Sequence, residues 1–143
     1  MKLEKYRYIV VEGPIGVGKT SLARRIATHL DSPLLLEEPA ENPFLEKFYT
    51  DIPRYALPTQ LFFLFQRNNQ VQSLAQMDVF TQGVVSDFLL DKDQLFAKLT
   101  LSDAEQDLYQ SIYSHLQPKA LLPDLVIYLQ ASTSTLIDRV KQR

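Results

Sequence analysis

Cysteine is absent from the 143-residue sequence, which excludes disulfide frameworks, thiolate metal sites and cysteine nucleophiles. An excess of positive charge is also missing, because 15 lysine and arginine residues face 17 aspartate and glutamate residues and leave a net charge of −2. A broad basic face for nucleic acid is therefore not expected. No apolar run reaches the ~18 residues of a membrane span, and the N-terminal segment has no cleavable apolar core. We expect a soluble, cytoplasmic protein that binds no nucleic-acid polymer and no membrane.

Glycine is scarce, with four residues where an average protein carries roughly 7%. Three of the four, Gly13, Gly16 and Gly18, lie within six consecutive positions. Such a cluster indicates a segment that needs unusual backbone geometry. The length suits one domain over residues 1–143, and a composition of 45% hydrophobic and 22% charged residues is typical of a globular protein.

Short apolar runs alternate with amphipathic segments along the chain. Strands are predicted over residues 8–12, 34–36, 84–86 and 125–129, and helices over residues 19–30, 43–49, 58–77, 87–99, 102–116 and from 134 onward. Continuously apolar strands that alternate with helices predict an α/β fold, a parallel sheet flanked by helices. The last helix has an apolar stripe but no terminating signal before Arg143, so we expect a helix that is cut short.

Residues 13–20 read Gly-Pro-Ile-Gly-Val-Gly-Lys-Thr, which satisfies the phosphate-loop pattern G-x-x-x-x-G-K-[ST]. The glycines allow successive backbone N–H groups to converge on phosphate oxygens at the positive end of the following helix. Lys19 is expected to reach the β- and γ-phosphates, and the Thr20 hydroxyl to ligate Mg²⁺. The expected ATP-binding residues here are Gly13, Pro14, Ile15, Gly16, Val17, Gly18, Lys19, Thr20 and Ser21.

Carboxylates follow two of the predicted strands, Glu38 after the second and Asp87 after the third. The carboxyl ends of parallel strands line the ligand crevice of an open sheet. Glu38 is therefore a candidate base for an attacking hydroxyl, and Asp87 a candidate Mg²⁺ ligand. The alternatives are a solvated acidic loop for Glu38 and an N-cap of the next helix for Asp87.

Two polar side chains, Gln60 and Arg67, interrupt the apolar face of the predicted helix 58–77. Asp93 lies in the same way on the apolar face of the next helix. Because a buried arginine costs several kcal/mol unless it is paired, we expect Arg67 to pair with Asp93. With the Gln60 amide, this pair would offer a planar donor–acceptor edge that can read a heterocyclic base. An interior salt bridge without a ligand is the alternative.

Together these residues resemble the deoxynucleoside kinase family, the group of deoxycytidine, deoxyguanosine and deoxyadenosine kinases. The likeness lies in the phosphate loop, in the pair Glu38-Pro39, in Tyr49 eleven residues before Gln60, and in Arg67 seven residues after it. The segments VEGPIGVGKTSLA and PTQLFFLFQR are similar to its bacterial branch.

The resemblance implies a P-loop kinase of nucleotide salvage that moves the γ-phosphate of ATP to the 5′-hydroxyl of a deoxynucleoside. It implies Glu38 as the catalytic base, acting with Lys19 and Arg139, the first arginine of a lid. Arg143 would be a second lid arginine that contacts ATP. The implied substrate-binding residues are Glu38, Tyr49, Gln60, Arg67 and Asp93. A homodimer is also implied.

The sequence departs from the family pattern in two places. Phe88 follows Asp87 where the family carries arginine, and the rest of the lid and the last strand would lie beyond Arg143. We therefore expect a C-terminally truncated member whose lid and last strand are missing. Two other hypotheses remain open: a nucleoside monophosphate kinase, and an ATP-binding module without turnover.

Overall fold

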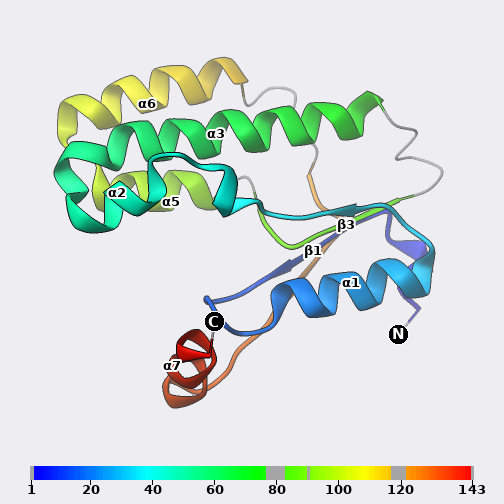
Figure 1. Cartoon of the computed structure of the whole chain (residues 1–143). Helices are drawn as coiled ribbons and strands as arrows, with labels where there is room; N and C mark the ends of the chain where they lie inside the picture. Colours follow the sequence, from blue (N-terminus) through cyan, green and yellow to red (C-terminus); the bar gives the residue numbers. More distant parts are fainter. Residues whose placement is uncertain (1, 77–82, 90, 117–121, 143) are drawn as a thin grey trace. The chain divides into compact units, whose positions relative to one another are not determined.

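A computed structural model of the chain describes residues 2–76, 83–89, 91–116 and 122–142 (Figure 1). The chain divides into two compact units. Residues 1–36, 77–89 and 122–143 form the first, which we call the sheet unit, and residues 37–76 and 90–121 form the second, the helical unit. This division does not test the prediction of one domain over residues 1–143, which stays a prediction. Among the described residues, no helix has both the length and the apolar character of a membrane span.

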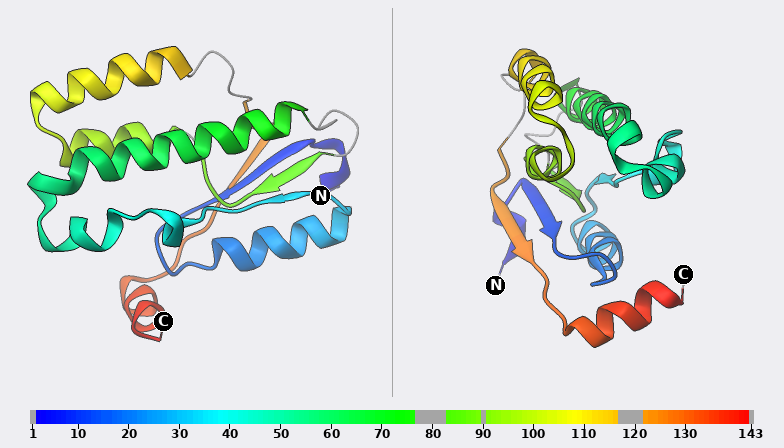
Figure 2. Two further views of the ribbon diagram at one scale, coloured as in Figure 1. Left: turned by 45° about the horizontal axis from the view of Figure 1, so that its top comes forward. Right: turned by 90° about the vertical axis from the view of Figure 1, so that its left-hand side faces the viewer.

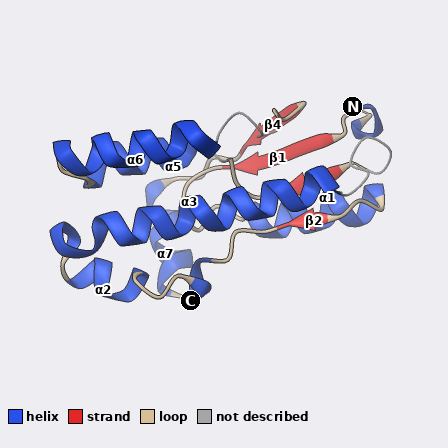
Figure 3. Cartoon of the chain, turned by 90° about the horizontal axis from the view of Figure 1, so that it is seen from above, coloured by secondary structure: helices blue, strands red, loops and turns tan. Residues whose placement is uncertain are grey.

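The sheet unit is built on four parallel strands, as predicted. They are β1 (Tyr8–Glu12), β2 (Leu34–Leu35), β3 (Val84–Ser86) and β4 (Leu125–Tyr128). Their order is β2-β3-β1-β4 (Figure 3). Ile9 of β1 lies opposite both Val85 of β3 and Leu125 of β4. A single turn of 3-10 helix, η1 (Leu3–Lys5), precedes β1. Strand β1 is therefore an interior strand, between β3 and β4, and the loop that follows it begins inside the sheet and not at its edge.

Among the described residues, two α-helices belong to the sheet unit. Helix α1 (Lys19–Leu30) begins directly after the glycine cluster, and Ile26 and Ala27 on its buried face pack with Ile9 and Val11 of β1. Helix α7 (Thr133–Lys141) begins at an N-cap, Ser132, whose hydroxyl accepts the backbone N–H of Thr135. Helix α1 has the predicted bounds, whereas α7 begins one residue before the predicted position 134 and ends at Lys141.

The helical unit consists of η2 (Pro39–Glu41), α2 (Leu45–Thr50), α3 (Ile52–Gln76), α5 (Lys92–Thr100) and α6 (Asp103–Leu116). Helix α3 contacts α2, α5 and α6 (Figure 2). The core contains Leu64, Ala97, Tyr109 and Tyr113, and the rings of the two tyrosines lie 6.2 Å apart. At the start of α6, Ser102 and Glu105 exchange side chain–backbone hydrogen bonds, which form a capping box.

The start of the long helix α3 was predicted wrongly, because the helix begins at Ile52 and not at Pro58. Pro53 occupies its first turn, where a missing backbone N–H costs no helical hydrogen bond. Pro58 lies inside the helix, so it marks no boundary. The described helix ends at Gln76, and the predicted end at Met77 lies outside the described residues.

The predicted helix 87–99 also begins later, because α5 starts at Lys92. Two long-range hydrogen bonds within the sheet unit engage the segment after β3: the Asp87 carboxylate accepts the Thr20 hydroxyl, and the Leu89 N–H donates to the Glu12 carboxylate. The Ser86 hydroxyl bonds to both backbone groups of Phe88. Asp87 is therefore not an N-cap, and that alternative is wrong.

Candidate active site

The glycine-rich segment forms a loop between β1 and α1, where a phosphate loop must lie. Gly13 has φ +152°, and a Cβ there would lie 2.7 Å from the Leu129 carbonyl oxygen and 2.9 Å from a methyl carbon of Val17. Gly18 has φ +101° with open space around it, so its requirement is conformational and not steric. Gly16 and Gly83, the other two glycines of the chain, also have positive φ. The glycine cluster thus has the backbone geometry that its sequence pattern predicts.

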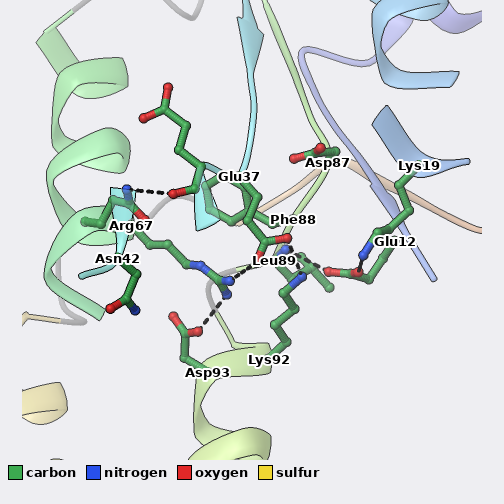
Figure 4. Close-up of polar contacts among 12 residues, drawn as sticks. Glu12, Lys19, Glu37, Asn42, Arg67, Asp87, Phe88, Leu89, Lys92 and Asp93 are labelled. Carbon is green, nitrogen blue, oxygen red and sulfur yellow. Dashed lines mark hydrogen bonds and ion pairs between the residues drawn. The ribbon is translucent and has the colours of Figure 1, made fainter. Parts of the chain in front are cut away.

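The lysine of this loop pairs with a carboxylate that sequence reasoning missed. The Lys19 ammonium lies 3.6 Å from Glu12 Oε1, which also accepts the Gly13 N–H at 3.1 Å. The other carboxylate oxygen accepts the Leu89 N–H at 3.0 Å (Figure 4). Glu12 therefore joins the start of the loop, its lysine and the segment after β3. The one signal in the sequence is an acidic residue that ends an apolar strand directly before the first loop glycine.

Thr20 and Asp87, the two predicted metal ligands, lie next to each other. The Thr20 hydroxyl donates to Asp87 Oδ2 at 2.6 Å, and Asp87 is buried. A hydroxyl and a carboxylate are the hard oxygen donors that Mg²⁺ prefers. Within the described ranges, no three acidic, histidine or cysteine side chains gather into a metal site of their own. The pair therefore fits a Mg²⁺ ion whose remaining ligands are water and phosphate oxygens.

Arg139 of α7 contacts the phosphate loop directly. Its guanidinium Nη1 donates to the carbonyl oxygens of Gly16 at 3.2 Å and Val17 at 3.1 Å. These bonds place a permanent positive charge beside the loop. The second predicted lid arginine, Arg143, lies outside the described residues.

In the helical unit, the expected pair of Arg67 and Asp93 forms. Arg67 Nη1 donates to Asp93 Oδ1 at 2.6 Å, and the two residues are 3% and 1% exposed. Burial raises the pKa of Asp93 to about 7, against the opposing effect of the Arg67 charge. The other oxygen, Asp93 Oδ2, is buried and accepts no hydrogen bond from any described residue. The pair therefore retains one buried acceptor that a ligand could satisfy.

Two further charged residues, which sequence reasoning missed, extend this pair. Arg67 Nη2 donates to Glu37 Oε1, and the Lys92 ammonium lies 3.3 Å from Glu37 Oε2 (Figure 4). Glu37 adjoins Glu38 in sequence and Lys92 adjoins Asp93, but no helical or strand period points to either residue. The four side chains, Lys92, Glu37, Arg67 and Asp93, alternate in charge, and we call them the charge network.

The remaining predicted substrate residues also lie in the helical unit. Gln60 is buried on α3, as expected, whereas Tyr49 is 70% exposed on α2. Glu38 is exposed and directly precedes η2. A hydrogen bond with Glu41 and the negative charge of Glu41 raise the pKa of Glu38. The structure brings Arg67 and Asp93 into contact, while the roles of Gln60, Tyr49 and Glu38 stay predictions.

Comparisons with known proteins show which family this chain resembles. The sequence model of the family described as deoxynucleoside kinase matches residues 9–143. Deoxyguanosine kinase of Bacillus subtilis is 35% identical over 139 residues, which cover 95% of this chain and 66% of the relative. Deoxyadenosine/deoxycytidine kinase of the same organism is 32% identical over 149 residues, which cover 99% of this chain and 67% of the relative.

The fold has close counterparts among solved structures. Deoxyadenosine kinase from M. mycoides, in a structure with the products dCMP and dCDP bound, matches with a TM-score of 0.80 at 27% identity, over 95% of this chain and 70% of that one. The same enzyme with dCTP bound matches with a TM-score of 0.79. This chain thus spans about two thirds of the length of these bacterial relatives, and 56% of a deoxyadenosine kinase from Dictyostelium discoideum.

The predicted α/β class, a P-loop kinase fold with a parallel sheet, is confirmed by the sheet order and by these structural matches. The family match covers the phosphate loop, the Thr20–Asp87 pair and the Arg67–Asp93 pair. The chain therefore belongs to the deoxynucleoside kinase family.

Proposed function

We propose that the protein transfers the γ-phosphate of ATP to the 5′-hydroxyl of a deoxynucleoside. The observation that carries this proposal is the buried Arg67–Asp93 pair with its unsatisfied acceptor, Asp93 Oδ2. An arginine donor beside a carboxylate acceptor complements a base edge that has both an acceptor and an amino group. The relatives that carry the names of deoxyguanosine and deoxyadenosine kinases support the same reaction.

Residues of the sheet unit would bind the phosphates of ATP. The loop N–H groups and Lys19 would hold the β- and γ-phosphates of ATP, and Arg139 would add positive charge beside the loop. Thr20 and Asp87 are the residues that would hold Mg²⁺. When bound, this ion would neutralise charge on the transferring phosphate.

Residues of the helical unit would bind the deoxynucleoside and activate its 5′-hydroxyl. Glu38 would take the proton of the 5′-hydroxyl, for which a pKa raised toward the working pH is favourable. Tyr49 would hold the sugar, and Gln60, Arg67 and Asp93 would read the base. The adjacent acids Glu37 and Glu38 disfavour a nucleoside monophosphate, since its own phosphate would need basic residues.

The family resemblance also supports a homodimer located in the cytoplasm. The net charge of −2 supports the absence of a nucleic-acid polymer as partner.

Phosphate transfer from labelled ATP to a panel of deoxynucleosides and their monophosphates tests the proposal. We expect 5′-monophosphates to form from one or more deoxynucleosides, and no product from the monophosphates. Transfer to monophosphates alone would favour the monophosphate kinase hypothesis. ATP binding without transfer to any member of the panel would favour the binding module.

Glu41→Gln is expected to move the acid limb of the pH profile of kcat/KM to lower pH. Glu38 must be ionised to act as a base, and Glu41 raises its pKa, so activity is lost as the pH falls through that raised value. Removal of the Glu41 charge lowers the pKa of Glu38 and extends activity to more acidic solutions. The profile is measured between pH 4 and pH 8, with the exposed Glu46→Gln as matched control. If the acid limb of the profile did not move in Glu41→Gln, Glu41 would not control the ionisation of the catalytic base.

A further inference from the structure

The Arg67 guanidinium is held from two sides by carboxylates of different segments. Nη1 donates to Asp93 of α5 at 2.6 Å, and Nη2 donates to Glu37, which directly precedes Glu38. A guanidinium is planar and its donors form a rigid fork. Two hydrogen bonds from its two terminal nitrogens therefore fix the orientation of its plane, which one bond alone would leave free to turn. Figure 4 shows the guanidinium between the two carboxylates.

The charge of the arginine is balanced through the same contacts. The side chains of Arg67 and Asp93 are 3% and 2% exposed, so little solvent screens them. Glu37 adds a second negative charge to the arginine, and Lys92 compensates it at 3.3 Å. The network thus contains two positive and two negative side chains. Loss of the Glu37 charge would leave the network with a net charge of +1, and loss of the Lys92 charge with −1, beside a pair that little solvent screens.

We propose that Glu37 and Lys92 are positioning residues for base recognition: they fix the Arg67 guanidinium, and through it the buried oxygen Asp93 Oδ2, in the orientation that selects the base. The inference rests on the proposed function, because it assigns the network to a deoxynucleoside. Neither residue needs to touch the substrate. Glu37 acts by its bond to Arg67, and Lys92 by keeping the charge of Glu37 balanced.

Three variants test the inference: Glu37→Gln, Lys92→Met and the double variant. Glu37→Gln retains an acceptor for Arg67 but leaves the network with a net charge of +1, and Lys92→Met leaves it with −1. The double variant restores neutrality. Assays are run at pH 8.5, above the raised pKa of about 7 of Asp93, so that its carboxylate is ionised. The charged groups that act on this carboxylate are Arg67 of α3, Lys92 and Glu37, and Tyr109 and Tyr113 of α6 interact with it as well.

Each single variant is expected to raise the KM for the preferred deoxynucleoside by about tenfold or more. It should also change the ratio of kcat/KM between deoxyadenosine and deoxyguanosine. The KM for ATP should change by less than about twofold, because ATP contacts the other unit. The double variant should recover most of the lost affinity, and this non-additivity is the signature of a shared charge balance. Lys98→Met, an exposed lysine of the same helix, is the matched control.

The outcomes separate the inference from the function on which it rests. A wild-type protein that phosphorylates no deoxynucleoside would overturn the proposed function, and the positioning role with it. An active wild-type protein whose single variants keep both KM and base preference would overturn the inference alone. The inference would also be overturned if the fold increase in KM of the double variant equalled the product of the increases of the two single variants. Urea unfolding of every variant distinguishes a lost fold, which would lower ATP affinity as well, from a lost orientation.

Discussion

Glu38→Gln is expected to lower kcat by about 10²–10⁴-fold, the usual contribution of a general base, while ATP still binds. A glutamine has nearly the shape of glutamate but cannot accept the proton of the 5′-hydroxyl. Glu38 is exposed, so the exchange removes no buried contact of its side chain. The residues expected to bind ATP lie in the sheet unit, whereas Glu38 lies in the helical unit. Turnover is measured by release of ADP with saturating deoxynucleoside, and binding by titration with a fluorescent ATP analogue.

Glu46→Gln provides the control for this experiment, because it removes an exposed glutamate of the same unit without touching the proposed machinery. Its turnover should match that of the wild-type protein. If Glu38→Gln turned over as fast as the wild type, Glu38 would not be the base. A loss of ATP binding in Glu38→Gln would instead indicate a structural role for this side chain.

Arg67→Met is expected to lower the free energy of unfolding by about 3–5 kcal/mol, the cost of breaking a buried ion pair from one side. The variant leaves the Asp93 carboxylate, which is 1% exposed, without its hydrogen-bonded counter-charge. Such a loss is a large share of the roughly 5–15 kcal/mol that holds a domain folded. It is measured by urea unfolding at fixed pH.

The loss of unfolding free energy should depend on pH, because protonation of Asp93 neutralises the charge that Arg67→Met leaves unpaired. The pKa of Asp93 in the folded protein, about 7, lies above its ordinary value of 3.8. Stability linked to this proton is therefore complete below pH 3.8 and is lost as the pH rises through about 7. Without Arg67 the pKa of Asp93 rises further, so Arg67→Met should lose more stability at pH 8 than at pH 5.

Arg54→Met is the matched control, since Arg54 is an exposed arginine of the same helix that lies 5.4 Å from the Tyr55 ring. It should change the free energy of unfolding by no more than about 0.5 kcal/mol. An equal loss for Arg67→Met at pH 5 and pH 8 would contradict the explanation by Asp93. A loss no greater than that of Arg54→Met would contradict the buried pair altogether.

Local patterns in the sequence were sufficient for the fold class and for the phosphate loop. A run of four apolar residues that ends in Glu12, a glycine cluster and an amphipathic segment follow one another directly, and each is recognised from neighbouring residues only. The pairing of Arg67 with Asp93 was predictable for a different reason. A charge on an apolar helix face requires a partner, and only a few oppositely charged residues occupy comparable positions.

Other features could not be predicted, because distant contacts decide them. The segment after β3 is bonded to Thr20 and Glu12, which lie 67 and 77 residues away in the sequence, and the helix expected there starts only at Lys92. The bond of Glu37 to Arg67 spans 30 residues and leaves no period in the sequence. The early start of α3 escaped prediction because proline is favoured in the first turn of a helix and is costly in its interior, so Pro58 indicated a helix start, whereas it lies inside the helix.

The use of glycine only at positions of positive φ also affects the conformational entropy of the unfolded chain. All four glycines serve conformations that other residues adopt only under strain, so none is present as a merely flexible residue. An average chain of this length would contain about ten glycines. Each glycine replaced by a residue with a Cβ lowers the conformational entropy of the unfolded state, which favours folding by roughly 0.4–1 kcal/mol. The scarcity of glycine therefore stabilises the native state by a few kcal/mol, because it lowers the conformational entropy of the unfolded chain. This stabilisation comes from no contact in the folded protein.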